Sequence, residues 1–335
     1  VVGTLISFGM SGIGLGWQLQ MATMIIPALI YGYLFIKLDF PPTERVSSGV
    51  STKDMYKAVL APLFIFVFIC MFGTAITELF TNQWVGVLLQ NVTSSAILVL
   101  ALVAAVQVVG RAFAGPVVHR ISPAGLLLAS AIVATIGIYL LATLSGGAIF
   151  IAAIIFGIGV AYFWPTMIGF VAENIPNSGA LGLNLLGGAG MLAVSIYMFF
   201  MGGYYDNLVT AALPAGSNLD AYRSAAAGTP EAAAYAQAQL TAGPQVLKAT
   251  NIIPLILVFA FLHLVPGDPV DHLAGDLATP QQRAQIAHCM GLDRSLPAQF
   301  VTFLGHVADG TLGHQCPDPA HRPTVASRIE SVMPY

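Results

Sequence analysis

Four polar or aromatic residues within one apolar run are the first that could do chemistry. Glu78 and Asn82 are one helical turn apart, and Gln83 and Trp84 follow directly. A charge at the centre of a membrane span costs about 2.5–3.5 kcal/mol on insertion scales, so this carboxylate needs a partner or water. The group could hydrogen-bond a polar solute while the indole stacks on its ring. The alternative is a hydrated Glu78 near the end of a long helix.

A second polar group lies near the end of a later apolar run. Gln107 and Arg111 are one turn apart, and Arg111 could simply snorkel to the interface. The other interpretation is a gate, in which Arg111 pairs with Glu173 at the end of another span. A solvated rim of charges is the simpler alternative.

Three more residues could line a path or merely pack. Tyr162 and Trp164 lie beside Pro165, where packing at a kink is the commoner role. Asn184, in a glycine-rich run, either faces a solute or hydrogen-bonds a neighbouring helix. The predicted substrate-binding residues are Glu78, Asn82, Gln83, Trp84, Gln107, Tyr162, Trp164 and Asn184.

No pattern of a catalytic or cofactor site is found in the sequence. A nucleophile elbow, a phosphate-binding loop and a metalloprotease helix are all missing. The His and Cys residues at 288–289, 314–316 and 321 match no zinc spacing. We therefore expect no enzyme, no cofactor and no metal. A net charge of −3 without a basic run gives no reason to expect a nucleic-acid partner.

The composition indicates a protein that lies mostly in lipid. Hydrophobic residues make up 57%, charged residues 8%, and the mean hydropathy is +0.81, beyond the range of soluble domains. A crossing needs about 20 apolar residues, and the pattern predicts an all-α, polytopic fold with about seven to eight transmembrane helices. The predicted spans are 1–13, 18–36, 62–89, 95–114, 126–144, 148–171, 180–201 and 252–265. The last is short and needs help from its flanks.

Charged loops predict the topology of these spans. The loop from Lys37 to Lys57 is rich in Lys and Arg, which indicates a cytoplasmic position. Arg111 and Arg120 fall two crossings later, on the same side. The Ala-rich stretch 204–249 is then an external loop with one short helix through Pro230 to Leu240. Because the chain opens inside an apolar stretch, we expect a fragment of a longer protein.

The polar residues 262–335 form a separate tail with soluble-helix signals. Thr279-Pro280-Gln281-Gln282 has the pattern of a capping box, and Gly291 is placed to end a helix through Arg283 to Met290. A second helix, from Pro297 to Ala308, carries an apolar stripe. Its members are Phe300, Phe303, Leu304 and Val307.

Residues 1–261 resemble the major facilitator superfamily, from its fifth to its twelfth helix. The sequence from Gly110 to Arg120, GRAFAGPVVHR, is similar to the short cytoplasmic turn between the eighth and ninth helices. The resemblance implies a truncated N-terminal bundle at 1–36, a cytoplasmic inter-bundle loop at 37–57 and a C-terminal six-helix bundle at 58–261. It also implies a latch that closes the bundle. The predicted gating residues are Gly110, Arg111, Gly115, Arg120 and Glu173.

Residues 261–335 resemble the N-terminal part of a dipeptide or oligopeptide permease of ABC importers. Two ordered motifs carry the resemblance, LHLVPGDP at 262–269 and GLDRSLP at 291–297. The two resemblances require opposite directions for the helix near Ala260. We therefore expect a fusion of unrelated pieces near 259–262.

The leading prediction is a bacterial inner-membrane, multi-pass secondary carrier for a small, sugar-like solute. It works by rocking two bundles, and with most of the first bundle missing we expect no transport by this chain alone. The expected partners are the solute and the lipid bilayer. One alternative is an ABC peptide-importer subunit with an ATPase partner, and another is a membrane-anchored interaction module.

Overall fold

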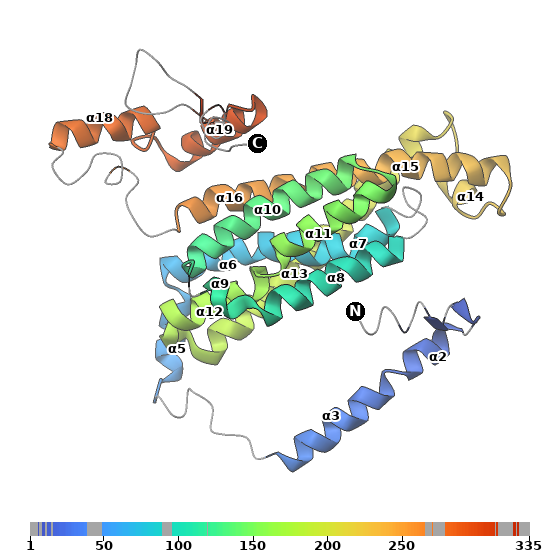
Figure 1. The fold of residues 1–335 in the computed structure, drawn as a ribbon, viewed down its shortest axis with the longest axis horizontal. Coiled ribbons are helices and arrows are strands. Elements are labelled where there is room, and N and C mark those ends of the chain that lie inside the picture. Colours follow the sequence, from blue (N-terminus) through green and yellow to red (C-terminus); the bar gives the residue numbers. More distant parts are fainter. Residues whose placement is uncertain are drawn as a thin grey trace. The chain divides into compact units, whose positions relative to one another are not determined.

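The fold is described from a computed structural model of the 335-residue chain (Figure 1). The described residues are 6, 9–10, 12–14, 16–38, 49–88, 96–118, 120–264, 270, 279–311, 313, 324–325 and 327. The chain divides into two compact units, Val1–Phe261 and Leu262–Tyr335. The predicted all-α fold is confirmed.

Long apolar helices dominate the first unit. Within the described residues, six helical segments are long and apolar enough to cross a membrane: Trp17–Lys37, Pro62–Gly86, Pro123–Thr143, Gly146–Asn174, Pro176–Ala212 and Pro230–Leu262. A shorter apolar helix covers Leu98–Ala112. Most ends of five predicted spans agree with these segments within a few residues, and the five spans are thereby confirmed: 18–36, 62–89, 126–144, 148–171 and 180–201. The predicted span 1–13 lies mostly outside the described residues.

The helices and turns of this unit follow one another closely along the chain. Their bounds are α2 (Trp17–Ala22), α3 (Ile25–Lys37), α5 (Thr52–Val59), α6 (Pro62–Ala75), η1 (Ile76–Phe80), α7 (Thr81–Leu88), α8 (Ala96–Ala112), α9 (Ala114–Val118), α10 (Pro123–Thr143), η2 (Gly146–Ala148), α11 (Ile149–Val160), α12 (Phe163–Asn174), η3 (Pro176–Ser178), α13 (Gly179–Ala212), α14 (Leu219–Arg223), α15 (Pro230–Thr250) and α16 (Ile252–Leu262). Several begin with a polar cap or with proline in the first turn, as at Ser122 and Thr229.

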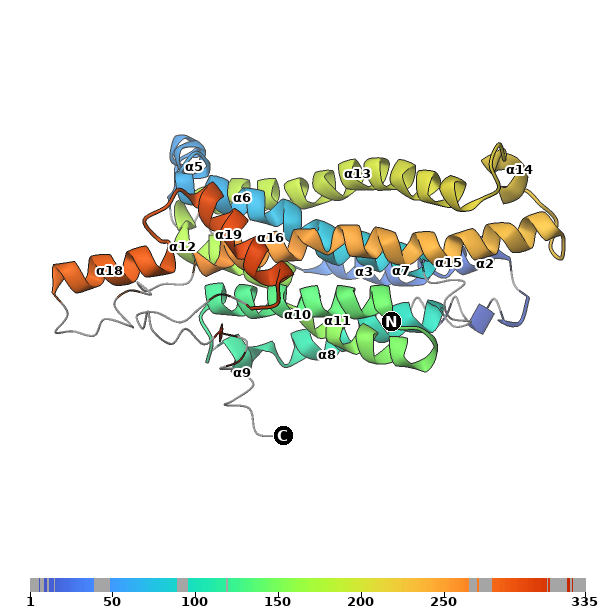
Figure 2. The ribbon, with the colours of Figure 1, turned by 90° about the horizontal axis from the view of Figure 1, so that it is seen from above.

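Small residues allow the bundle helices to approach closely. Helix α11 contacts both α10 and α8 (Figures 1 and 2). A Cβ added at Gly137 in α10 would lie 2.5 Å from the Cα of Phe156 in α11, and Gly159 meets the backbone of Ala134 in the same way. Helix association in lipid depends on such close packing, because the surrounding lipid tails are as apolar as the side chains.

The stretch 204–249 differs from the expected external loop. Helix α13 continues to Ala212, and α15 occupies Pro230–Thr250. Alanine has the highest intrinsic helix propensity, so an Ala-rich segment forms a helix although its hydropathy is modest. Continuing into α16, this helix reaches Leu262 and gives a span of 33 residues, which removes the shortfall of the predicted 252–265 crossing.

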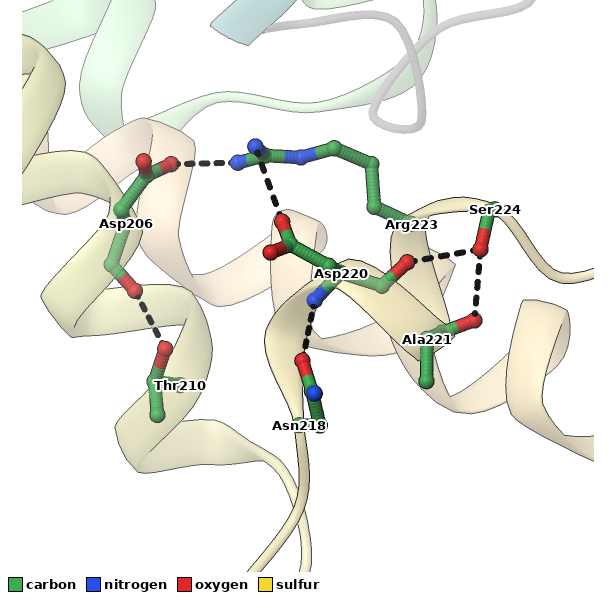
Figure 3. Close-up of polar contacts among 7 residues, drawn as sticks. All are labelled: Asp206, Thr210, Asn218, Asp220, Ala221, Arg223 and Ser224. Atoms are coloured by element: carbon green, nitrogen blue, oxygen red, sulfur yellow. Dashed lines mark hydrogen bonds and ion pairs between the residues drawn. The ribbon is translucent and has the colours of Figure 1, made fainter.

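A small polar cluster connects α13 to α14 (Figure 3). The Nη2 atom of Arg223 lies 2.7 Å from Oδ1 of Asp206, and its Nη1 lies 3.9 Å from Oδ1 of Asp220. All three side chains are substantially exposed. Exposed ion pairs of this kind contribute about 0–1 kcal/mol, so the cluster orients the turn more than it stabilises the fold.

The second unit contains the two helices predicted for the tail. Helix α18 (Pro280–Met290) begins with the predicted capping box between Thr279 and Gln282 and ends at Gly291, whose φ is +71°. Helix α19 covers Leu296–Ala308. Its predicted apolar stripe is half-buried. Both helix predictions are confirmed.

Candidate functional site

Glu78 and Arg111 form an ion pair inside the first unit. Nη2 of Arg111 lies 2.6 Å from Oε1 of Glu78, and Nε2 of Gln107 lies 3.5 Å from the same oxygen. The Glu78 side chain is only 5% exposed, whereas that of Arg111 is 40% exposed. The cost of burying the carboxylate is therefore offset by a guanidinium that still reaches the surface.

A π-helical turn places Glu78 in this position. The helix from Pro62 to Leu88 is α-helical except at Ile76–Phe80, where it widens to a π-turn. Single π-turns inside α-helices occur often at functional sites. Three oxygen atoms on this turn and the next are buried and have no hydrogen-bond partner within the described residues: Oε2 of Glu78, Oγ1 of Thr81 and Oδ1 of Asn82.

Two further hydrogen bonds join the end of α8 to the break between α11 and α12. Proline at 165 has no N–H, so the carbonyl of Ala161, four residues earlier, loses its helical donor. Nε of Arg111 donates to that carbonyl at 2.8 Å. In return, the hydroxyl of Tyr162 donates to the carbonyl of Gly110 at 3.1 Å. Arg111 thus connects three helical segments.

The proposed pairing of Arg111 with Glu173 is not what the structure shows. Arg111 pairs with Glu78, and Glu173 forms no ion pair within the described residues. Both residues nevertheless line one cavity of about 300 Å³. It is lined by Arg111, Ala114, Pro123, Tyr162, Pro165, Thr166, Gly169, Phe170 and Glu173.

The aromatic residues predicted to face a solute contact other side chains of the bundle. Trp84 stacks on Phe80 with ring centroids 5.4 Å apart, and its edge-to-face contact with Tyr205 spans 6.0 Å. A face of the indole is thereby covered by the protein itself. Trp164 lies against Gly190, where an added Cβ would be 2.9 Å from the ring. Both tryptophans are half-buried.

The remaining predicted residues lie apart from the Glu78 network. Gln83 is exposed on α7 and Asn184 is exposed on α13. Gly115 in α9 and Arg120 after it are also exposed. The structure therefore brings together Glu78, Gln107, Gly110, Arg111 and Tyr162. His119 of the predicted turn lies outside the described residues.

In the second unit, the GLDRSLP motif forms a tight turn between α18 and α19. The N–H of Leu292 donates to the carbonyl of Ala287 at 2.9 Å across the left-handed Gly291. Nδ1 of His288 lies 2.6 Å from Oδ2 of Asp293, and this hydrogen bond holds the pKa of Asp293 below its ordinary value. The turn is thus fixed by its backbone and by one side-chain pair.

A glutamine of α19 connects this turn to the other permease-like motif. Nε2 of Gln299 donates to the carbonyls of Arg294 at 2.8 Å and Leu292 at 3.3 Å. Its Oε1 lies 3.4 Å from Nε2 of His263, which belongs to the LHLVPGDP motif. Residues 265–269 of that motif lie outside the described residues. The described parts of the two motifs therefore meet at Gln299, a residue that the sequence reasoning missed.

Comparison with known proteins identifies what these motifs resemble. Residues 245–328 match the family model of the N-terminal part of the membrane component of binding-protein-dependent transport systems. That segment includes the end of α15, all of α16, and both tail helices. It is similar to ABC-importer permeases. The predicted resemblance of the tail is confirmed, and the match begins at residue 245 rather than at 261.

Individual relatives agree with the family match. The di/tripeptide transport system permease of Pseudomonas aeruginosa is 41% identical over 59 residues, 17% of this chain and 18% of the relative. The glutathione transport system permease of Salmonella typhimurium is 42% identical over 67 residues, 20% of this chain and 22% of the relative. A putative peptide permease of Brucella ovis is 41% identical over 61 residues, 18% of this chain and 19% of the relative. The chain spans about a fifth of the length of the curated relatives that it matches.

These matches correct the leading functional prediction. A major-facilitator carrier for a sugar-like solute was expected, whereas the matches are to peptide and glutathione permeases. That carrier prediction is wrong, and the resemblance of residues 1–261 to the superfamily gains no support from the comparisons. The relatives and the long apolar helices make the chain a multi-pass protein of the bacterial inner membrane.

Proposed function

We propose that the chain acts as part of the membrane subunit of an ABC-type importer for small peptides. The observation that carries the proposal is the match of residues 245–328 to the N-terminal part of permease subunits. The relatives at 41–42% identity are named for di/tripeptide and glutathione transport. A short peptide is therefore the proposed cargo, and it is moved without being chemically changed.

The geometry of the second unit supports this function. Gly291, the His288–Asp293 pair and the Gln299 hydrogen bonds hold α18 and α19 as a defined helical pair. A defined pair of short helices that comes later in the chain than a long apolar helix offers a surface that another subunit can recognise. The proposed domain boundary separates this permease-like tail, 262–335, from the helical bundle.

An importer of this type needs two further proteins. The proposed partners are an ATPase subunit that drives transport and a substrate-binding protein that delivers the peptide. In the first unit, the Glu78–Arg111 pair and the Tyr162–Gly110 hydrogen bond would act as a latch that holds α8 against η1 and the start of α12. The chain itself performs no enzymatic reaction in this proposal.

Partner capture tests the proposal. The tagged full-length chain is expressed in a bacterial inner membrane, cross-linked, purified in detergent and analysed by mass spectrometry. An ABC ATPase or a peptide-binding protein is expected among the cross-linked partners. Replacing Gly291 by Val, which strains the left-handed position, is expected to reduce the yield of partners. Gln281→Ala, an exposed change at the other end of α18, is the matched control.

Two results would contradict the proposal. One is a folded chain that captures neither partner. The other is capture that is equally strong with Gly291→Val, because the permease-like turn would then play no part in assembly.

A further inference from the structure

The cavity of the first unit follows one face of α12 along its whole length. Its lining residues on this helix and its N-cap are Tyr162, Pro165, Thr166, Gly169, Phe170 and Glu173. Successive lining residues are three positions or one position apart in the sequence, which places them on a single stripe along the helix. The cavity is therefore an elongated groove parallel to the helix axis, with α8, α9 and α10 contributing Arg111, Ala114 and Pro123.

Opposite charges mark the two ends of this groove. Arg111 hydrogen-bonds the carbonyl of Ala161, two residues before the start of α12. Glu173 is exposed in the last turn of the same helix and forms no ion pair within the described part of the chain. Arg111 uses Nε and Nη2 for Ala161 and Glu78, and its Nη1 donates no hydrogen bond within the described residues. One end can thus receive a carboxylate and the other an ammonium group.

The wall between these charges is mostly apolar. Pro165, Gly169 and Phe170 supply no side-chain hydrogen-bonding group, and Thr166 adds a single hydroxyl. A ligand that fills the groove must therefore have an apolar middle, because an unpaired polar group there loses its hydration.

The length of the groove limits the ligand further. About 16 Å of helical rise separates Tyr162 from Glu173, and the Glu173 side chain leans back toward the start of the helix. The charged atoms are thus roughly 10 Å apart, which is about the length of three extended residues. A compact zwitterion such as a single α-amino acid cannot reach both ends.

We propose that this groove binds an elongated zwitterion with an apolar middle, its carboxylate at Arg111 and its ammonium group at Glu173. Two kinds of molecule share this chemistry, an ω-amino acid and a short apolar peptide. The proposal does not depend on the importer function, because its residues all lie outside the matched segment 245–328. Failure of one proposal therefore leaves the other intact.

Gly169 offers a way to block the groove without disturbing the fold. A Cβ at this position meets no atom within 4 Å, so a leucine side chain would extend into the groove. Gly203 in α13 is equally open and is not among the lining residues. Gly203→Leu is therefore the matched control for Gly169→Leu.

Calorimetric titration of the purified full-length chain in detergent tests the proposal. The probes are 8-aminooctanoate, trialanine, octanoate and 4-aminobutanoate. At least one of the first two is expected to bind saturably and at least tenfold more tightly than octanoate, which lacks the ammonium group, and 4-aminobutanoate, which is too short. If only one binds, it identifies the kind of ligand.

The variants locate the bound probe. Glu173→Gln is expected to weaken binding at least tenfold, which corresponds to about 1.4 kcal/mol, while Glu231→Gln in α15 leaves the affinity unchanged. Gly169→Leu is expected to abolish binding and Gly203→Leu to preserve it. The proposal is overturned if neither zwitterion binds, if octanoate binds as tightly, or if binding persists in Gly169→Leu.

Discussion

Removing Arg111 alone should destabilise the bundle more than replacing both partners of the Glu78–Arg111 pair. In Arg111→Met, the carboxylate of Glu78 remains buried, with 5% exposure, but loses its charged partner. Breaking a buried pair costs about 3–5 kcal/mol, and the 40% exposure of Arg111 favours the lower end. The carbonyl of Ala161 also loses its donor, which adds about 1 kcal/mol. We expect a total of about 4 kcal/mol.

The reverse change is milder, because Arg111 can be hydrated where it reaches the surface. Glu78→Gln replaces a charge-assisted hydrogen bond by a neutral one and should cost about 1.5 kcal/mol. The double variant leaves no isolated charge, so about 2.5 kcal/mol is expected. The two single costs together then exceed the double cost by about 3 kcal/mol, which is the coupling energy of the pair.

Unfolding in detergent measures these energies. SDS titration followed by tryptophan fluorescence is suitable, since Trp84 and Trp164 both lie in the bundle. Asp206→Asn with Arg223→Met, an exposed ion pair, serves as the control, and its coupling should stay within about 1 kcal/mol. Additive costs for Glu78 and Arg111, with no coupling beyond the control, would refute the reasoning.

Three further predictions concern the turn of the tail and the helix crossing. The hydrogen bond from His288 lowers the pKa of Asp293. The stabilising effect of this hydrogen bond is therefore present above the ordinary pKa of about 3.9 and is lost as pH falls through the lower pKa of the folded state. Circular-dichroism melts below pH 5 should show this loss in the wild type and not in Asp293→Asn. Gly291→Ala should cost about 1 kcal/mol in the same melts, because its φ of +71° disfavours a side chain. Gly137→Ala should destabilise the bundle by about 1–3 kcal/mol in SDS titration, since its methyl group would overlap Phe156; an unchanged midpoint would contradict the close crossing.

Local signals in the sequence predicted much of the fold. Hydropathy located the span 18–36, which the structure extends by one residue at each end to Trp17–Lys37. The capping-box pattern at Thr279 and the glycine at 291 located α18. These signals succeed because a span and a capped helix are determined by residues close together in the chain.

The candidate site could be predicted only in part, because it depends on how distant helices pack. The sequence pattern marked Glu78 and Arg111 separately and suggested that Arg111 pairs with Glu173. In the structure the ion pair joins Arg111 to Glu78, which lies 33 positions earlier in the chain. Likewise, the loop expected at 204–249 is largely helical, since hydropathy underestimates alanine-rich helices. One available signal was missed: Pro165 frees the carbonyl of Ala161, which attracts a nearby donor.

Peptide uptake tests the central claim most directly. The complex isolated through the tagged chain is reconstituted in liposomes, and uptake of a radiolabelled di- or tripeptide is followed with and without ATP. Accumulation that requires ATP and is inhibited by excess unlabelled peptide is the predicted result. Uptake that proceeds equally well without ATP would contradict the importer function, and so would a complex that hydrolyses ATP without accumulating peptide.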